Sequence, residues 1–590
     1  MSTTNWIELV FVLILLAIST PILGNYMAKV YGKGKAPGDR FFLPIENAVY
    51  RVSGLDPESE QRWSTYVISL LVFTAVGIAF TYAILRLQGH LPLNPDHQVG
   101  VKPPLAFNTA TSFGTNTNWQ NYAGESTMSQ LSQMLALVWH QFISAAVGMA
   151  LAAAFIRALV RKGTNTLGNF WVDTIRSTTR ILLPISFVFA FVFMSQGTIQ
   201  NFHAERSVTT IAVQSVNSKG QAVATQTIPG GPVASMLPIE GLGDNGGGFF
   251  NANGAHPFQI PNPISSVIYI WLLLMIPFAF PWTFGKMIGS LRQGMVVLTA
   301  MGVLFMIGML IVLGAEGRGN PKLSPSGTTQ AATATHPGGN LEGKEMRFGV
   351  GLSGIEANSI TATSTGTTNS AHDSYTPIGG SVPLFQIMLG EVDPGGTGTG
   401  LYGMLIMVFI SVFIAGLMVG RTPEYLGKKI QGPEVKLTAL YILVLPFSVL
   451  IFAGAAVLLP HALSSLEAIG PQSANASGTP HGLTELVYAY ASGAHNNGSA
   501  FAGLNGNTLW WNTTLAINML VGRFALIIPA MAIAGSLVRK RPVPATAGTL
   551  RTDTPLFTGM LMLVTVIITG LTYFPVLALG PLAEHFTGRF

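Results

Sequence analysis

The sequence predicts an all-α membrane protein that crosses the bilayer several times. The 590 residues are 49% hydrophobic and only 9% charged, whereas soluble domains carry about 25% charged residues. Apolar segments long enough to cross a hydrocarbon core of about 30 Å occur ten times along the chain. Between them, a stretch rich in glycine, asparagine and threonine recurs four times. Non-helical backbone survives at membrane depth only where protein encloses it or where it lines a wet cavity. We therefore expect about ten transmembrane helices that enclose loops.

The expected spans follow from apolar length alone. They cover residues 6–26, 63–85, 131–160, 181–196, 267–287, 295–313, 383–419, 437–459, 509–537 and 556–579. No Lys or Arg precedes the first segment, so we interpret it as a span rather than a cleaved signal. The seventh is interrupted by a glycine-rich run at 390–400, which no continuous helix could contain.

Lysine and arginine indicate the orientation of the chain. One set of loops, those after the odd-numbered spans, is rich in basic residues: Lys29, Lys33, Lys35, Arg40, Arg51, Arg62, Arg157, Arg161, Lys162, Arg176, Arg180, Lys286, Arg292, Arg421, Lys428, Lys429, Lys436, Arg539, Lys540, Arg541 and Arg551. The other loops are longer in total but hold fewer: Arg86, Lys102, Arg206, Lys219, Arg318, Lys322, Lys344, Arg347 and Arg589. By the positive-inside rule the first set is cytoplasmic, and both termini are extracytoplasmic. Because topology accounts for the basic residues, they do not indicate a nucleic-acid partner.

The four glycine- and asparagine-rich stretches all fall in outer loops. They are residues 114–120, 243–257, 363–369 and 495–500. A single stretch of this kind is usually a surface turn. Fourfold recurrence instead predicts an internal repeat of span, re-entrant loop and span. We place the repeats at 63–162, 163–292, 293–430 and 431–545, with an additional span in 1–62 and another in 546–590.

Each stretch follows a short segment that could form half a helix, such as residues 480–488. The negative C-terminal end of such a helix favours a cation. Glycine permits unusual backbone angles, so a run of carbonyls could turn toward one axis and replace the water shell of an ion. The loops therefore predict an ion filter, whereas segments 207–227 and 324–335 read as loop insertions without chemistry.

Motifs for catalysis are weak. Residues 338–344 match the front of a nucleotide-binding P-loop, but Glu345 replaces the required Ser or Thr, no strand precedes the run, and the topology puts it outside. The sequence has no Asp-Lys-Thr-Gly phosphorylation run and no cysteine. His372 and Asp373 lack partners at metal-ligand spacing, so we interpret them as a capping or hydrogen-bonding pair. We expect no catalytic residue in this chain.

Three charged residues fall in the interior of the expected spans, away from their ends. They are Glu391 and Asp393 in the broken seventh span and Arg523 in the ninth. Charges at membrane depth are costly and mark functional sites by default. For the two acids a water-filled turn remains an equal alternative.

The chain resembles a known family. The matching runs are residues 114–122, 245–257, 342–349, 416–429 and 496–504, with Gly522-Arg523. They resemble the potassium-binding A subunit of the Kdp-type ATP-driven potassium pump of bacteria and archaea. The resemblance implies four channel-like repeats around one filter, a fold shared with potassium symporters. It also implies a location in the bacterial or archaeal plasma (inner) membrane. The expected partners are a P-type ATPase subunit that hydrolyses ATP and small accessory membrane subunits.

The resemblance also implies which residues handle the transported K⁺; no cofactor is expected. The filter residues are Thr115, Asn116, Thr117, Asn118, Asp244, Asn245, Gly246, Thr365, Gly366, Asn496, Asn497 and Gly498. Glu391, Asp393 and Arg523 are expected beneath the filter, in ion exit or gating. Three positions depart from the family pattern, namely Asp244 where Thr is usual, Thr365 where Cys is common and His495 where Asn is common. Asp244 would add a negative charge near the filter.

Two other functions remain open from the sequence. The first is a passive potassium channel or an ion-coupled potassium symporter of the same architecture, which a neighbouring gene for a P-type ATPase would argue against. The second is a solute transporter with broken helices. That class predicts two inverted halves, and four similar loops on one side argue against it.

Overall fold

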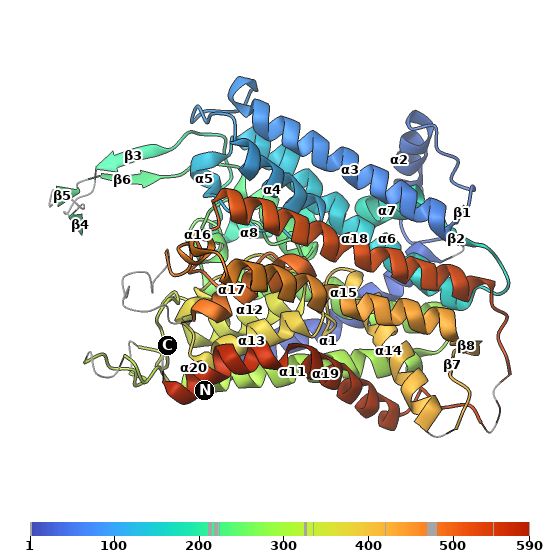
Figure 1. The fold of residues 1–590 in the computed structure, drawn as a ribbon. Coiled ribbons are helices and arrows are strands. Elements are labelled where there is room, and N and C mark those ends of the chain that lie inside the picture. Colours follow the sequence, from blue (N-terminus) through green and yellow to red (C-terminus); the bar gives the residue numbers. More distant parts are fainter. Residues whose placement is uncertain are drawn as a thin grey trace.

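The computed structural model describes residues 3–32, 34–209, 215–216, 222–223, 225–323, 327–333, 336–418, 420–468, 481–544, 546 and 548–588. Within this part, ten helical segments are long and apolar enough to cross a membrane, so the chain is a multi-pass membrane protein. They run side by side through the bundle in Figure 1. The two ends of the described chain lie at the same end of the bundle, as an even number of spans requires.

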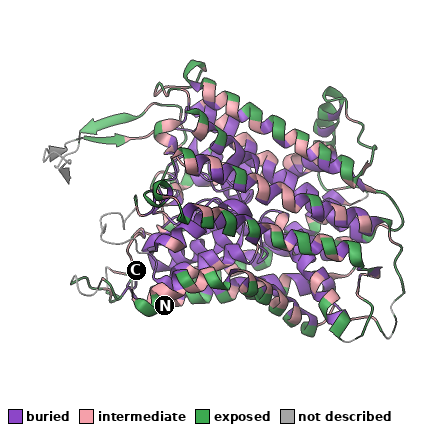
Figure 2. Ribbon diagram, in the orientation of Figure 1, coloured by how far each residue is buried: buried purple, intermediate pink, exposed green. Residues whose placement is uncertain are grey.

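The spanning segments are α1 (Thr3–Tyr31), α3 (Trp63–Leu87) with η1 (Gln88–His90), η2 (Ser132–Val138) with α6 (Trp139–Val160), α7 (Phe170–Ser177) with η3 (Thr178–Leu182) and α8 (Leu183–Gln196), α10 (Pro263–Met287), α11 (Leu291–Gly317), α14 (Thr399–Met418), α15 (Gly432–Val457), α18 (Leu509–Arg539), and α19 (Pro555–Leu577) with η7 (Ala578–Leu582) and α20 (Ala583–Thr587). Their interior faces pack into a continuous apolar core. Figure 2 shows buried residues at the centre of the bundle and exposed ones around its perimeter. The perimeter is rich in apolar side chains such as Phe11, Phe187 and Phe447, as contact with lipid demands.

Shorter helices lie between the spans. Four of them, here called the pore helices, are α4 (Pro103–Gly114), α9 (Val233–Leu242), α12 (Gly349–Ala362) and α17 (Gly482–His495). The others are α2 (Asp39–Val52), α5 (Gly124–Thr127), η4 (Asn253–Ala255), η6 (His372–Ser374), α13 (Pro377–Met388) and α16 (Pro460–Leu463).

The pore helices reveal four units of one plan, each made of a span, a pore helix, a loop and a second span. The units are α3–α4–α6, α8–α9–α10, α11–α12–α14 and α15–α17–α18. The remaining spans lie outside this plan, because α1 packs mainly against α10 and α19 against α11 and α14. The fold class is therefore the expected one. The exact residue limits drawn for each repeat from the sequence remain predictions.

Four small antiparallel strand pairs lie at the two ends of the bundle. At one end β1 (Gln61–Arg62) pairs with β2 (Thr166–Gly168), and β7 (Glu424–Tyr425) pairs with β8 (Lys428–Lys429). At the other, β3 (Arg206–Thr209) pairs with β6 (Thr225–Ile228), and β4 (Ser215–Val216) pairs with β5 (Ala222–Val223). The β3–β6 ladder projects from the bundle in Figure 1. The segment 207–227, interpreted from the sequence as a loop insertion, thus forms short strand pairs in its described parts. The rest of that segment, and parts of 324–335, lie outside the described residues.

The fourth span begins earlier than expected. The helix starts at Phe170 rather than at residue 181. Asp173, Arg176 and Arg180 interrupt the apolar pattern, which is why hydropathy placed the start too late. In the structure Arg157 pairs with Asp173 and Arg180 with Glu46. Because partners satisfy these charges, the helix continues through them.

The seventh span is broken where glycines predicted it. Helix α13 ends at Met388 and α14 begins at Thr399, so only α14 is long enough to span. The expected range of 383–419 therefore contains the end of α13, the predicted break and the spanning helix α14. The pore helix of the fourth repeat was predicted correctly in type, although Pro480 at its expected start lies outside the described residues.

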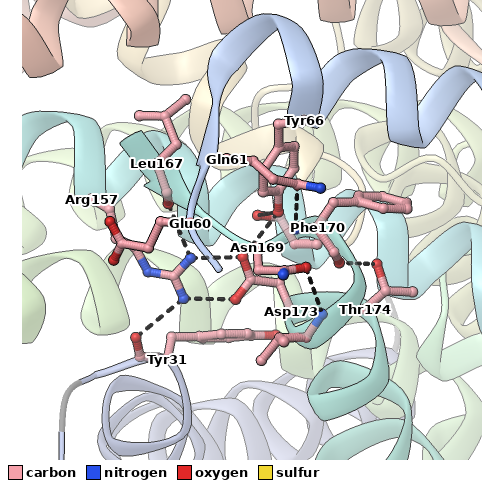
Figure 3. Close-up of polar contacts among 12 residues, drawn as sticks. Tyr31, Glu60, Gln61, Tyr66, Arg157, Leu167, Asn169, Phe170, Asp173 and Thr174 are labelled. Atoms are coloured by element: carbon pink, nitrogen blue, oxygen red, sulfur yellow. Dashed lines mark hydrogen bonds and ion pairs between the residues drawn. The ribbon is translucent and has the colours of Figure 1, made fainter. Parts of the chain in front are cut away.

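A buried ionic cluster joins four helices at the end of the bundle opposite the chain termini. The Arg157 guanidinium donates two hydrogen bonds to Asp173, each 2.7 Å long. The Tyr66 hydroxyl donates to the same carboxylate at 3.0 Å, and Arg157 also donates to the carbonyl of Tyr31 at 3.3 Å (Figure 3). The cluster thus ties α1, α3, α6 and α7 together and has no spare donor on the Nη atoms of Arg157.

Candidate functional site

The four pore helices end at one place, and their loops share one backbone pattern. In each loop the third residue donates its N–H to the carbonyl five residues earlier. The four bonds are Thr117 to Ser112 at 2.9 Å, Asn245 to Glu240 at 3.1 Å, Thr365 to Ile360 at 3.3 Å and Asn497 to Ser492 at 2.8 Å. This common bond aligns four quartets of residues, namely 115–118, 243–246, 363–366 and 495–498. We call them the filter loops and number their positions one to four.

Positions two and four adopt a left-handed backbone in three of the loops. At position two φ is 66° for Asn116, 49° for Asp244 and 60° for Asn496. Position four has positive φ at Asn118, Gly246 and Gly498. Glycine and asparagine tolerate this region best, which explains the composition of the stretches. The third loop lacks positive φ at both positions, so the pseudo-symmetry is incomplete.

Carbonyl oxygens from three loops converge on the fourth. A Cβ atom built on Gly366 would lie 3.0 Å from the Thr117 oxygen, 3.1 Å from the Asn245 oxygen and 3.2 Å from the Asn497 oxygen. These three oxygens belong to position three of the other loops. A Cβ on Gly498 would lie only 1.7 Å from the Thr117 oxygen. At Gly498 only glycine fits, whereas at Gly366 a Cβ would crowd the space that the three carbonyls share.

Side chains at position two link the loops in a closed ring. Asn116 donates to the Asp244 carbonyl at 3.0 Å, and the Asp244 carboxyl accepts from Thr365 at 3.4 Å. Ser364 donates to the Asn496 carbonyl at 2.7 Å, and Asn496 donates to the Thr117 hydroxyl at 2.9 Å. Each bond joins one repeat to the next, and the fourth returns to the first. The ring therefore fixes the spacing of the loops.

Further side-chain hydrogen bonds hold the filter loops in place. Ser144 of α6 donates to the side-chain oxygen of Asn116 at 2.6 Å and lies 3.2 Å from that of Asn245. Asn497 donates to the carbonyls of Ile360 and Thr363 at 2.8 and 3.0 Å. Sequence reasoning missed Ser144, since nothing distinguishes one serine within an apolar helix.

A vestibule opens above the filter loops. It is a cavity of about 440 Å³ whose floor includes Asn118, Gly366 and Gly498. The remaining lining residues are Trp119, Gln120, Asn121, Tyr122, Ala123, Thr127, Asn251, Asn253, Thr368, Ala500, Ala502, Leu504, Asn505, Gly506 and Asn507. The lining side chains are neutral, and many are amides. Their oxygens can hold a hydrated cation without trapping it as a carboxylate would.

The broken seventh span lies directly beneath the filter loops. Residues 391–398 are buried, and Gly395 donates its N–H to the Ala362 carbonyl at the end of α12 at 2.9 Å. Thr397 donates to the Asp244 carboxyl at 2.5 Å. The negative charge introduced by Asp244 therefore has two hydroxyl partners, Thr365 and Thr397. Thr397 is a second residue that sequence reasoning missed, because it lies within a glycine run.

The three charged residues expected beneath the filter do not all meet. Glu391 and Arg523 line one small cavity of about 30 Å³ with Ser364 and Asn496. The Arg523 guanidinium also donates to the Ser144 carbonyl at 3.3 Å. Asp393 is fully buried but does not line this cavity; it lies near Gln386. Two of the three expected inner residues thus lie next to the filter loops.

Two motifs weighed in the sequence have structural partners. Lys344, in the run that resembles a P-loop, pairs with the buried carboxylate of Glu316 at 2.9 Å and lies over the ring of Tyr375. His372 contacts the Tyr488 hydroxyl at 3.2 Å, consistent with a hydrogen-bonding role. Among the described residues, no group of three or more His, Asp or Glu side chains could hold a metal ion.

The fold and the site together define a multi-pass membrane protein in which four pore loops meet at one axis. The chain belongs to the potassium-transporting ATPase A subunit family, whose sequence profile matches residues 9–586. The potassium-transporting ATPase potassium-binding subunit of Mycobacterium tuberculosis is 53% identical over 587 residues, covering 99% of each chain. The corresponding protein of Mesorhizobium japonicum is 48% identical over 585 residues, covering 99% of this chain and 98% of that one.

Among solved structures, the chain is similar to the potassium transporter TrkH from Vibrio parahaemolyticus. The two sequences are 15% identical, the TM-score is 0.48, and the match covers 89% of this chain and 97% of that one.

Proposed function

We propose that this chain selects K⁺ at the filter loops and passes it inward as the potassium-binding subunit of an ATP-driven import complex. The convergence of three carbonyl oxygens on Gly366 carries the proposal. Rings of backbone carbonyls replace the hydration shell of K⁺ in selective pores. The C-terminal ends of four pore helices point at the same place and add negative potential.

The proposed ligand set follows from the geometry. The position-three carbonyls of Thr117, Asn245 and Asn497 supply oxygens from three repeats, and the fourth loop contributes through Thr365 and Gly366. The other filter residues expected from the sequence hold these carbonyls in place. They are Thr115, Asn116, Asn118, Asp244, Gly246, Asn496 and Gly498. The names of the curated relatives, potassium-binding subunits, support K⁺ as the ion.

We propose further that another subunit hydrolyses ATP. Lys344, the lysine of the run at 338–344, is paired with the buried carboxylate of Glu316 rather than free to contact a phosphate. The relatives' names place them in a potassium-transporting ATPase. A P-type ATPase subunit and small accessory membrane subunits are thus the proposed partners. The vestibule and both termini face outside in this proposal, since the basic loops lie at the opposite end.

The segment beneath the filter is proposed as the inner gate, with Glu391 and Arg523 at the ion exit. Glu391 lies beside the Ser364 and Asn497 side chains of two filter loops. We also assign Asp393 to this gate. It lies in the same loop as Glu391, although it does not line the cavity that Glu391 and Arg523 share.

The test is potassium-stimulated ATP hydrolysis by the complex purified with its native partners. Gly366→Ala places a methyl group within about 3 Å of three carbonyl oxygens, in the space proposed for the ion. We expect at least a tenfold rise in the K⁺ concentration for half-maximal activity, equivalent to about 1.4 kcal/mol. Gly570→Ala is the control, because nothing lies within 4 Å of a Cβ at that position. Equal K⁺ activation in both variants would refute the site.

A further inference from the structure

Helix α2 turns its polar side chains toward the protein and its apolar side chains outward, the reverse of a surface helix in a soluble protein. Its inward face holds Asp39, Glu46 and Tyr50, with Phe42 between them, all on one side at helical spacing. Its outward face is apolar: Phe41 is 66% exposed, Ile45 43%, Val49 37% and Val52 89%. A helix that surrounds its polar groups with protein and presents apolar groups outward is suited to a non-aqueous neighbour.

The inward face is anchored on one arginine. Arg180 donates to the Glu46 carboxylate at 2.5 and 2.8 Å and to the Asp39 carboxylate at 2.6 Å. Its guanidinium also lies over the Phe42 ring, 5.7 Å from the centroid. Arg180 is 2% exposed, so this contact is a buried, two-carboxylate clamp. The clamp fixes which side of α2 faces the bundle.

The clamp also fixes the depth of α2. Arg180 lies well inside the spanning segment Phe170–Gln196. Further along the same segment, Leu183, Phe187 and Phe191 present exposed apolar side chains. The outward face of α2 therefore lies beside a surface that must contact lipid. Only seven residues separate α1, which ends at Tyr31, from α2, which starts at Asp39, so α2 cannot move far from the membrane.

The third side of α2 carries exposed basic and polar groups. Arg40, Asn47 and Arg51 follow one another along this flank and are exposed. In Figure 1, α2 stands across the direction of the spanning helices, at the end of the bundle away from the termini. An apolar face, a basic flank and an orientation across the spans are the features of a helix that lies in the membrane interface.

We infer that α2 is an interfacial helix, with Phe41, Ile45, Val49 and Val52 in contact with lipid acyl chains and with Arg40 and Arg51 at the level of the headgroups. The inference does not depend on the proposed potassium site. Acidic headgroups would attract the basic flank on the side of the membrane where lysine and arginine gather.

The sequence makes a direct test simple, because it contains no cysteine. Single substitutions Ile45→Cys, Val49→Cys, Asn47→Cys and Val188→Cys would each carry a nitroxide spin label. The labelled complex is placed in vesicles of equal parts phosphatidylcholine and phosphatidylglycerol, and the unsubstituted complex gives the background signal. Val188, 57% exposed on a spanning helix, reports lipid, and Asn47 is the matched control on α2 itself.

The readout is the collision rate of each label with oxygen, which concentrates in lipid, and with a water-soluble nickel complex. We expect labels at 45 and 49 to favour oxygen several-fold more than the label at 47, approaching the value at 188. Nickel accessibility at 45 and 49 equal to that at 47 would place the face in water and overturn the inference. Low accessibility to both reagents would show that a protein partner covers the face, which also overturns it. Retained K⁺-stimulated ATP hydrolysis in each variant confirms an intact fold.

Discussion

At the scale of the residue, the proposed filter depends on backbone more than on side chains. The oxygens that converge on Gly366 are carbonyls; a Cβ would crowd them at position 366 and would clash with the Thr117 oxygen at position 498. Side chains act one step away, in the ring that joins Asn116, Asp244, Ser364 and Asn496 to their neighbouring loops. A substitution in the ring should therefore change selectivity without adding bulk to the axis.

Ser364→Ala tests the ring. The change removes the 2.7 Å bond to the Asn496 carbonyl and adds no volume. One such bond contributes about 1 kcal/mol, so we expect about a fivefold rise in the K⁺ concentration for half-maximal ATP hydrolysis. We also expect weaker discrimination against Rb⁺, since the loops are less firmly spaced. Ser195→Ala is the control, because Ser195 is exposed on α8. An unchanged half-saturation and an unchanged ion preference would show that the ring has no part in binding.

At the scale of the element, the break between α13 and α14 is the feature that a plain transmembrane helix would lack. Its backbone is packed so closely that a Cβ on Gly395 would lie 2.0 Å from the Glu391 carbonyl, and one on Gly398 2.3 Å from the Gly148 carbonyl. The segment therefore holds one defined conformation against α6 and α12. A gate here would act by exchanging that conformation for another.

Glu391→Gln addresses the gate. The substitution keeps the shape of the side chain and removes its charge, so we expect the transport rate to change while K⁺ affinity remains within about a factor of two. The measurement is the maximal rate and the half-saturation of K⁺-stimulated ATP hydrolysis in the same preparation. Glu58→Gln, an exposed glutamate in the loop after α2, serves as the control. If affinity falls as much as rate, the residue belongs to the binding site.

In the first turn of α17, outside the spanning helices, lies the buried titratable residue Glu485. Burial, with the nearby carboxylates of Glu467 and Asp373, raises the pKa of Glu485 above its ordinary value of 4.5. The folded protein therefore binds a proton that the unfolded chain releases above pH 4.5, so stability falls as pH rises above that value. We expect a higher melting temperature at pH 5 than at pH 8. Glu485→Gln should raise the melting temperature at pH 8 and reduce the difference between the two. If the melting temperature of the variant differs between pH 5 and pH 8 as much as that of the unsubstituted protein, Glu485 is not the cause of the pH dependence.

At the scale of the whole molecule, we propose that this chain provides the path for the ion and that a partner provides the energy. Its described loops opposite the termini are short, and the longest lies between α1 and α3. Nucleotide-binding domains need roughly 50–200 residues. We therefore propose that a partner docked on this chain supplies the energy for transport.

The purified chain without partners tests that division of roles. Reconstituted in vesicles, it should hydrolyse no ATP and should allow at most a passive, K⁺-selective flux. Tracer uptake with and without ATP is the measurement, and the native complex is the positive control. ATP-driven K⁺ accumulation by the chain alone would refute the proposal.

The sequence by itself determined the features that depend on local composition. Eight of the ten spans were recognised close to their observed limits, because apolar length is readable residue by residue, and the charge bias placed both termini on one side. The fourfold recurrence of glycine and asparagine located the filter loops, since these residues most readily accept the left-handed backbone found at Asn116, Gly246 and Gly498.

Only the tertiary structure decided which groups meet. The Thr117, Asn245 and Asn497 carbonyls come from segments more than a hundred residues apart, and no local pattern encodes their convergence. The contact of Thr397 with Asp244 and the anchoring of α2 on Arg180 likewise join distant segments. The early start of the fourth span has the same origin. In the sequence, Asp173 and Arg180 would carry a large desolvation penalty in a membrane helix. Tertiary packing supplies the ion-pair partners that offset this penalty.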